Sequence, residues 1–423
     1  SATAKKYSNA SILLARYLMN CSYPNGKNPY WGEGSVSTSI KSRIKTFLGY
    51  LGSKYDDNPD VQALRYFVNN SNGTAPYNIA QYTPVKIVTD RTGWTTRDSM
   101  FFMNAKCAGY HGHRDALAIL YYYSGRALLT DTGTTSTSAT HPHYNFQHNS
   151  TRSHNTIEID GRAQTWQKRI ELGADMGEIT IVGNNSYSST SAWTTANTDD
   201  ISTTSASGST VTHKTDFTHY RHVSYMKALG EILFVSDKVV PADTASHGYC
   251  QNWHSAPYSN PTLAADAYDT GRTNFSSGAN LLIAQVDGES ITSALHTGYD
   301  ASASATTTQY FKYKKEVAGT VTFQTVLYPM PEGTTATVKP TKITMNGTSD
   351  DTALASRVSV NDSSRPTVKT IYHYHSFESA PATRSFDAFT TNAGTVTLVQ
   401  DGSNKVHFVA LTGGTSISSG NNV

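Results

Sequence analysis

Two patterns of apolar residues divide the chain. In residues 1–80 the apolar positions recur at the period of an amphipathic helix. Asn58 directly precedes Pro59, an order typical of a helix N-cap followed by the first helical turn. A turn-rich loop that contains Tyr30 and Trp31 separates the first two helical segments. The pattern therefore predicts three helices, over residues 8–20, 39–51 and 59–68.

From about Pro84 the period changes to two, which indicates β-strands. The most apolar of these segments are residues 85–88, 99–103, 117–123, 156–159, 178–182 and 231–235. Residues 187–209 are rich in Ser, Thr and Asn, so we expect a long surface loop or a polar sheet edge there. A further break near residues 298–308 separates the last strands from those before them.

These patterns predict a mainly β protein with an α-helical N-terminal part. A chain of 423 residues is long enough for two or three domains. We expect helices in residues 1–80, an antiparallel β-sandwich in 81–300 and a last β-sheet domain in 301–423.

Composition and charge narrow the function classes. The formal net charge is only +2, from 34 basic and 32 acidic residues, so no global charge attracts nucleic acid or an anionic membrane. No apolar segment approaches the length of a membrane span. Hydroxyl and amide side chains carry most of the polarity, which is typical of secreted β-proteins that handle sugars. Three cysteines leave open one disulfide or three buried thiols.

The histidines are unevenly distributed. None of the 15 lies before His111, and six fall between His111 and His154. Alternation along a strand would place His111 and His113 on the same face. A hairpin turn at Ser124-Gly125 would bring Asp131 opposite His113, and a further strand near His154 would complete the set.

Two imidazoles and one carboxylate suit a divalent metal ion, zinc first, with manganese or calcium as alternatives. The same histidines are also compatible with loop or surface positions in a Ser/Thr-rich protein. Spacing alone does not separate a structural ion from a catalytic one.

The order of these motifs resembles one known family. The chain reads His111-Gly-His-Arg-Asp115, then an apolar strand, then Gly125-Arg-Ala-Leu-Leu-Thr-Asp131-Thr-Gly133. It continues with Arg152-Ser-His-Asn-Thr-Ile-Glu-Ile-Asp-Gly161. This series resembles the signature of the heparinase II/III-like proteins.

The resemblance implies a fold and an activity. Proteins of this type are lyases of heparin, heparan sulfate or alginate, and they combine an α/α toroid with stacked antiparallel β-sheets. The three helices would then be the end of the toroid, with the substrate cleft between it and the sheets.

The resemblance also implies roles for individual residues. It puts metal ligands at His113, Asp131 and His154, and catalytic, substrate-contacting roles at His111 and Tyr144. Trp31 would stack on a sugar or pack the junction between helices and sheets, and Arg152 would meet a uronate carboxylate or a backbone carbonyl. The resemblance assigns nothing to three further histidines, which we expect to be loop residues: His141, His143 and His148.

One departure from the family pattern concerns the catalytic base. In the family, a tyrosine and an Asn-His pair come from toroid helices well upstream of the His-x-His motif, and residues 1–110 contain no histidine. We therefore expect this chain to be the C-terminal portion of a longer enzyme, whose N-terminal toroid segment is its partner, with little turnover by itself. A diverged protein without activity is the alternative.

The substrate expectation is alginate, because no dense Arg/Lys cluster suited to sulfate groups is visible in the sequence. Heparin or heparan sulfate is the alternative within the lyases. A noncatalytic polysaccharide-binding β-sandwich with a structural metal is a rival of another class. A hydrolase would need two carboxylates across the cleft, and the histidine-rich segment offers only Asp115 and Asp131.

Overall fold

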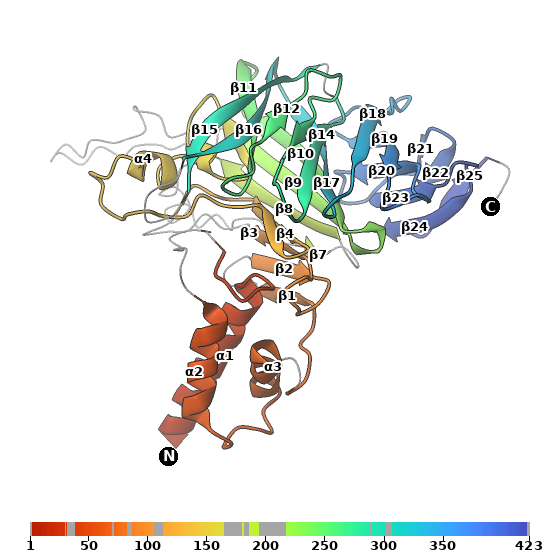
Figure 1. Cartoon of the computed structure of the whole chain (residues 1–423). Coiled ribbons are helices and arrows are strands. Elements are labelled where there is room, and N and C mark those ends of the chain that lie inside the picture. Colours follow the sequence, from red (N-terminus) through yellow and green to blue (C-terminus); the bar gives the residue numbers. More distant parts are fainter. Residues whose placement is uncertain are drawn as a thin grey trace.

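The structure is a computed structural model that describes residues 2–29, 31, 39–69, 72–82, 87–104, 113–164, 180–181, 186–193, 217–287, 290–300 and 307–420. Helices at the N-terminal end project from a body of stacked antiparallel sheets, and the C-terminal strands form the far end of that body (Figure 1). The predicted class, mainly β with an α-helical N-terminal part, is confirmed. Among the described helices, none has both the length and the apolar character to cross a membrane.

The three predicted helices are present as α1 (Ala2–Cys21), α2 (Ile40–Leu51) and α3 (Pro59–Val68). The Asn58 side chain caps α3 as predicted, because it accepts hydrogen bonds from the backbone N–H groups of Asp60 and Val61. The apolar faces of the three helices share one buried cluster that includes Ile12, Ile44 and Leu64.

The first sheet is an antiparallel meander that is covered on both faces. Its strands are β1 (Ile79–Tyr82), β2 (Ile87–Arg91), β3 (Met100–Asn104), β4 (Ala118–Tyr123) and β5 (Arg126–Leu129). Phe101 and Tyr121 face the central core, whereas Phe102 and Tyr122 pack toward the helical part. Burial on both faces explains why the predicted strands 99–103 and 117–123 are continuous apolar runs.

Two further sheets form the sandwich. The larger has the order β12-β13-β14-β17-β10-β9-β8-β7, and the smaller has the order β15-β16-β11-β6. The strands of the larger sheet are β7 (Thr180–Ile181), β8 (Ser186–Trp193), β9 (Phe217–Met226), β10 (Ile232–Pro241), β12 (Thr262–Leu263), β13 (Gly271–Arg272), β14 (Asn280–Gln285) and β17 (Val321–Met330). Those of the smaller sheet are β6 (Ile157–Ile159), β11 (Ser246–His254), β15 (Thr292–Tyr299) and β16 (Thr307–Ala318).

The polar segment expected as a loop or a sheet edge is, in its described part, a strand near one edge of the larger sheet. Strand β8 pairs with β9 along its whole length and with β7 on its other side. Residues 194–216, which include the rest of that segment, lie outside the described residues.

The C-terminal part forms a five-stranded sheet, ordered β18-β19-β20-β23-β24, and a three-stranded sheet, ordered β21-β22-β25. Their strands are β18 (Ala336–Lys342), β19 (Ala353–Asp362), β20 (Thr370–Ser376), β21 (Arg384–Phe386), β22 (Phe389–Thr391), β23 (Thr395–Gln400), β24 (Val406–Thr412) and β25 (Ile417–Ser419).

The predicted domain boundary at residue 300 is wrong. Strand β15 before it and strand β16 after it pair with each other in the smaller sheet. Strand β17 lies in the middle of the larger sheet, between β14 and β10. The break near residues 298–308 thus falls between two strands that pair within the sandwich, and a new sheet begins only after Met330.

The sheets stack because the larger sheet is apolar on both faces. One face, with Tyr225, Leu233 and Leu327, shares a core with the meander and the smaller sheet. The opposite face, with Phe234 and Tyr328, packs against the five-stranded C-terminal sheet. The order of layers is therefore helices, meander, sandwich and C-terminal sheets (Figure 1).

Candidate metal centre

Three buried side chains meet where the meander joins the sandwich. One ligand atom from each of His113, Asp131 and His154 lies within 4.8 Å of the others. Nδ1 of His154 is 2.7 Å from Oδ2 of Asp131, and the His113 and His154 ring centroids are 5.3 Å apart. The structure thus brings together the three residues predicted as metal ligands.

The β4–β5 hairpin positions two of these residues. His113 precedes β4, and Asp131 follows β5, with Ser124 and Gly125 at the turn between the strands. Both turn residues have positive φ angles, 46° and 93°, as a two-residue turn of a twisted hairpin requires. The hairpin predicted at Ser124-Gly125 is confirmed.

The third residue, His154, ends a short 3-10 helix, Thr151–Ser153, and its neighbour Asn155 fixes it to the hairpin. The Asn155 amide donates hydrogen bonds of 2.8 Å to the carbonyls of Ile119 and Thr130. The Asn155 side-chain oxygen accepts a 2.6 Å hydrogen bond from the backbone N–H of His254. One buried amide therefore joins three segments around the centre.

A buried ion pair between Arg221 and Asp237 holds two of the same segments together. Nη1 of Arg221 donates 2.7 Å hydrogen bonds to the carbonyls of Leu117 and Asn155. The guanidinium also binds Asp237 through two atoms, with Nε–Oδ1 at 2.7 Å and Nη2–Oδ2 at 2.8 Å. Burial alone would raise the pKa of Asp237, but Arg221 and His219 outweigh it and hold that pKa well below its ordinary value.

The pKa values of the titratable groups around the centre shift in different directions. Burial, with His154 and His148 nearby, lowers the pKa of His113 well below its ordinary value, so its imidazole is neutral and keeps a lone pair. Burial lowers the pKa of His154, but the Asp131 carboxylate reverses this effect and raises it. Asp115, which accepts a 3.0 Å hydrogen bond from Asn104, has its pKa raised to about 7 by burial.

The donor set fits zinc. Two imidazoles and one carboxylate form a three-ligand set that leaves a position open for water or substrate. The buried Nε2 of His154 has no hydrogen-bond partner among the described residues. A buried polar atom without a partner is unfavourable, and coordination of an ion would satisfy it.

Tyr144 and His148 extend the centre. Tyr144 begins the short helix α4 (Tyr144–Gln147), and its ring stacks on His148 with centroids 4.5 Å apart. The His148 ring lies in turn 4.6 Å from that of His113. His148 lies in the turn after α4, as expected for a loop histidine, but it is buried beside a candidate ligand, a position that the sequence did not indicate. His143 instead stacks on Tyr299, and His141 lies next to His143.

The other predicted site residues lie differently. His111 is outside the described residues, as is Tyr30. The exposed Arg152 guanidinium lies 5.7 Å from the Phe146 ring centroid, and the Arg152 carbonyl accepts a hydrogen bond from His254. Trp31 packs on Phe102, with centroids 5.3 Å apart, which agrees with the packing role of the two considered for it.

Sequence reasoning missed the supporting residues Asn155, Arg221 and Asp237. Asn155 adjoins His154 in the motif, and that adjacency was the only available signal. Arg221 and Asp237 lie opposite each other on β9 and β10, a pairing that no local pattern reveals.

Comparisons with known proteins agree with this architecture. The family model described as heparinase II/III-like, C-terminal, matches residues 96–352. A search of curated proteins found no match. The match to the family model covers more than half of the chain, including all three candidate ligands.

Solved structures with the same fold include a heparan sulfate lyase from Pedobacter heparinus. Its TM-score is 0.64 at 18% identity, over 82% of this chain and 50% of that one. A heparinase III gene product has a TM-score of 0.63 at 16% identity, over 85% of this chain and 51% of its own. Another heparinase III structure has a TM-score of 0.64 at 16% identity, over 86% of this chain and 54% of its own. This chain thus spans about half the length of these proteins, and it belongs to the heparinase II/III-like family.

Proposed function

We propose that this chain supplies the β-sandwich side of the active site of a polysaccharide lyase that cleaves uronate-containing chains by β-elimination. The observation that carries the proposal is the buried set of His113, Asp131 and His154 beside the aromatic pair Tyr144 and His148. Family membership and the shared fold support it.

The reaction requires a base, an acid and a means of stabilising negative charge. A base takes the C5 proton of the uronic acid, the electron pair of that bond forms the C4–C5 double bond, and the C4–oxygen bond breaks. The departing oxygen takes a proton from an acid. The uronate carboxylate must be neutralised, because charge develops on it as the proton leaves.

The residues of this chain have distinct roles in the proposal. His111 and Tyr144 contact the substrate and take part in proton transfer, and Arg152 binds the uronate carboxylate. Asn155 and Arg221 hold the segments that carry these groups. A divalent ion, zinc most readily, would be held by His113, Asp131 and His154, and its positive charge would keep the three segments together.

The main catalytic base would come from a partner toroid segment. Helix α1 offers an apolar surface against which that segment would pack. Tyr7, Leu14 and Leu18 fall on one stripe of the helix and are 70%, 59% and 37% exposed. We propose that further helices of the toroid cover this stripe.

Within the lyases we favour alginate as the substrate. Its charge comes from carboxylates alone, and the chain has no dense cationic cluster in its sequence. Heparan sulfate is the second candidate, because one structural neighbour is described as a heparan sulfate lyase. The Ser/Thr-rich composition and a polysaccharide substrate support secretion from a bacterium.

The test is an assay of the complete gene product with alginate and with heparan sulfate, followed by near-ultraviolet absorbance of the unsaturated product. Product from alginate, and its loss in His154→Ala, are the expected results. Product from heparan sulfate and none from alginate would make heparan sulfate, and not alginate, the proposed substrate. Tight binding of both polymers with no product at any pH would instead favour the noncatalytic polysaccharide-binding sandwich.

A further inference from the structure

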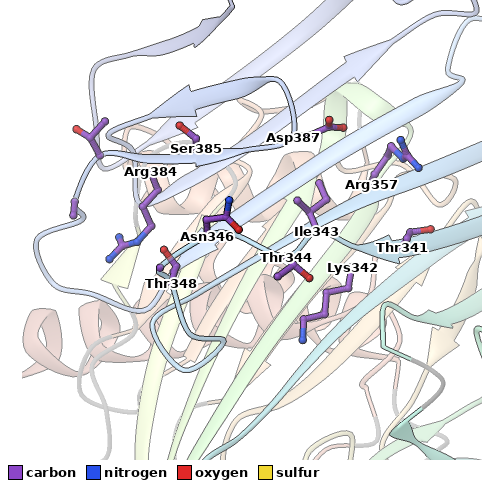
Figure 2. A pocket seen from close by; sticks show the side chains of 13 residues that line it. Thr341, Lys342, Ile343, Thr344, Asn346, Thr348, Arg357, Arg384, Ser385 and Asp387 are labelled. Carbon is purple, nitrogen blue, oxygen red and sulfur yellow. The ribbon is translucent and has the colours of Figure 1, made fainter.

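A polar groove lies on the C-terminal sheets, away from the candidate metal centre. It has a volume of about 770 Å³, within the range of about 300–1,000 Å³ typical of ligand pockets. Its walls come from the end of β18 and the turn after it, from Arg357 on β19, and from residues 382–387 around β21 (Figure 2).

The groove lies where two sheets meet above one shared apolar cluster. Strand β18 is the edge of the five-stranded sheet, and β21 is the edge of the three-stranded one. Met345, in the turn after β18, is buried in one apolar cluster with Phe386 of β21. Ile343 is bonded to β19 through a 2.8 Å hydrogen bond from its N–H to the carbonyl of Ala355. The walls are therefore held by buried contacts beneath them.

The lining combines cations with sugar-like hydrogen-bonding groups. The lining includes three basic side chains and one carboxylate, that of Asp387, and its other polar side chains are hydroxyls and the Asn346 amide. Figure 2 shows Arg357 and Asp387 at one end and Arg384 with Asn346 at the other, with Ile343 between them.

Two of the cations are held in place by carboxylates. Lys342 pairs with Asp350, and Arg384 binds Glu378 through both of its terminal nitrogens. Arg357 forms no ion pair within the described residues, and the Tyr372 hydroxyl lies beside both Asp387 and Arg357. Its guanidinium is thus the group with most capacity to bind an added anion.

We propose that this groove is a second, noncatalytic site that binds a short segment of an acidic polysaccharide. A uronate carboxylate would pair with Arg357, and ring hydroxyls would donate to Asp387 and exchange hydrogen bonds with Asn346 and the threonines. Single-stranded nucleic acid fits poorly, because its sites stack bases on aromatic rings and the groove lining has none. The choice of an acidic sugar rests on the proposed function.

The test measures binding of a size-defined oligomannuronate to the whole chain by calorimetry, with malto-oligosaccharide as the neutral probe. Arg357→Gln is expected to weaken oligomannuronate binding about tenfold, the effect of losing a charged hydrogen bond. Lys405→Ala removes an exposed cation from the β23–β24 turn of the same domain and should leave binding unchanged. Asn346→Ala is a second groove variant, and thermal unfolding checks that each variant is folded.

Other results would overturn the proposal. These are no oligomannuronate binding, equal binding by the Arg357→Gln and wild-type proteins, or binding of inorganic phosphate alone. Loss of binding in Asp131→Asn but not in Arg357→Gln would assign the sugar to the metal centre instead. The two proposals can fail separately. If the gene product forms no unsaturated sugar but still binds oligomannuronate through Arg357, the lyase proposal is wrong and the proposal of a binding groove stands.

Discussion

At the scale of single residues, the candidate metal centre depends on groups that are almost fully enclosed. His113 and His154 are 0% exposed and Asp131 is 2% exposed. The Asp131 carboxylate is the only acidic member of the set, and it also accepts a 3.0 Å hydrogen bond from the backbone N–H of Gly133. Its negative charge is therefore central to any affinity for a cation.

We expect Asp131→Asn to lower zinc affinity by about 100-fold or more, because even residues that only support metal ligands change affinity by about 10–100-fold. Zinc content after dialysis and competition with a chromogenic chelator would measure the change. Asp57→Asn, an exposed carboxylate on the helical part, is the matched control. Equal zinc binding by Asp131→Asn and the control would contradict the assignment of this ligand.

The Arg221–Asp237 pair gives a second prediction. Arg221→Met leaves a fully buried carboxylate without its main partner, so the free energy of unfolding should fall by about 3–5 kcal/mol. Denaturation in urea would measure it, with Arg43→Met at an exposed helical position expected to change stability by less than about 0.5 kcal/mol. An effect of the same size in both variants would show that the pair does not support the centre.

The sequence predicted the members of the centre better than their surroundings. His113, Asp131 and His154 stand at the ends of segments whose strand pattern is visible, so a hairpin and one further strand suffice to join them. Arg221 reaches this region from a strand 104 residues away from Leu117, and only the packing of two sheets creates that contact. The same packing buries the turn residue His148 beside His113, which the sequence did not indicate.

At the scale of elements, helices and central strands follow the apolar pattern, whereas boundaries between sheets do not. The strand at residues 117–123 was predicted from its apolar run, but the run does not say which sheets cover its two faces. The break near residue 300 resembled a domain boundary because polar turn residues mark hairpins and linkers alike. Strand pairing across the break resolves it.

One contact between elements is expected to weaken in acid. His222 of β9 stacks on His375 of β20 with ring centroids 3.9 Å apart, and both side chains are buried. Burial lowers the pKa of His222 to about 3 and that of His375 well below its ordinary value. The sandwich and the C-terminal sheet therefore meet through neutral imidazoles.

Stability should fall as the pH drops from about 6.5 toward 3. In that window the unfolded chain binds protons on these histidines and the folded chain does not, which changes the free energy of unfolding by about 1.4 kcal/mol per pH unit for each histidine. His222→Phe keeps the stacked ring but cannot bind a proton, so its loss of stability between pH 6 and pH 4 should be shallower. Urea unfolding at both pH values tests this, and identical slopes for variant and wild type would refute it.

At the scale of the whole molecule, the layers are mutually dependent because each inner sheet is apolar on two faces. Removal of residues 331–423 would uncover the face of the larger sheet that carries Phe234, Leu282 and Tyr328. Each such side chain contributes about 1.5–3 kcal/mol when it is fully buried. The shortened chain should aggregate or bind a hydrophobic dye, as size-exclusion chromatography and dye fluorescence would show. A monomeric, dye-negative product would mean that the C-terminal sheets are an independent appendage.

The assembly of the metal centre from distant segments has a consequence for how the protein acquires an ion. Asp131 and His154 are 23 residues apart in sequence, and their approach requires the β4–β5 hairpin to dock against the segment held by Asn155. A denatured chain has no such arrangement, so zinc uptake by this set would come late in folding. Bound zinc would then report that native tertiary structure has formed, and chelators would act on the finished protein rather than on its precursors.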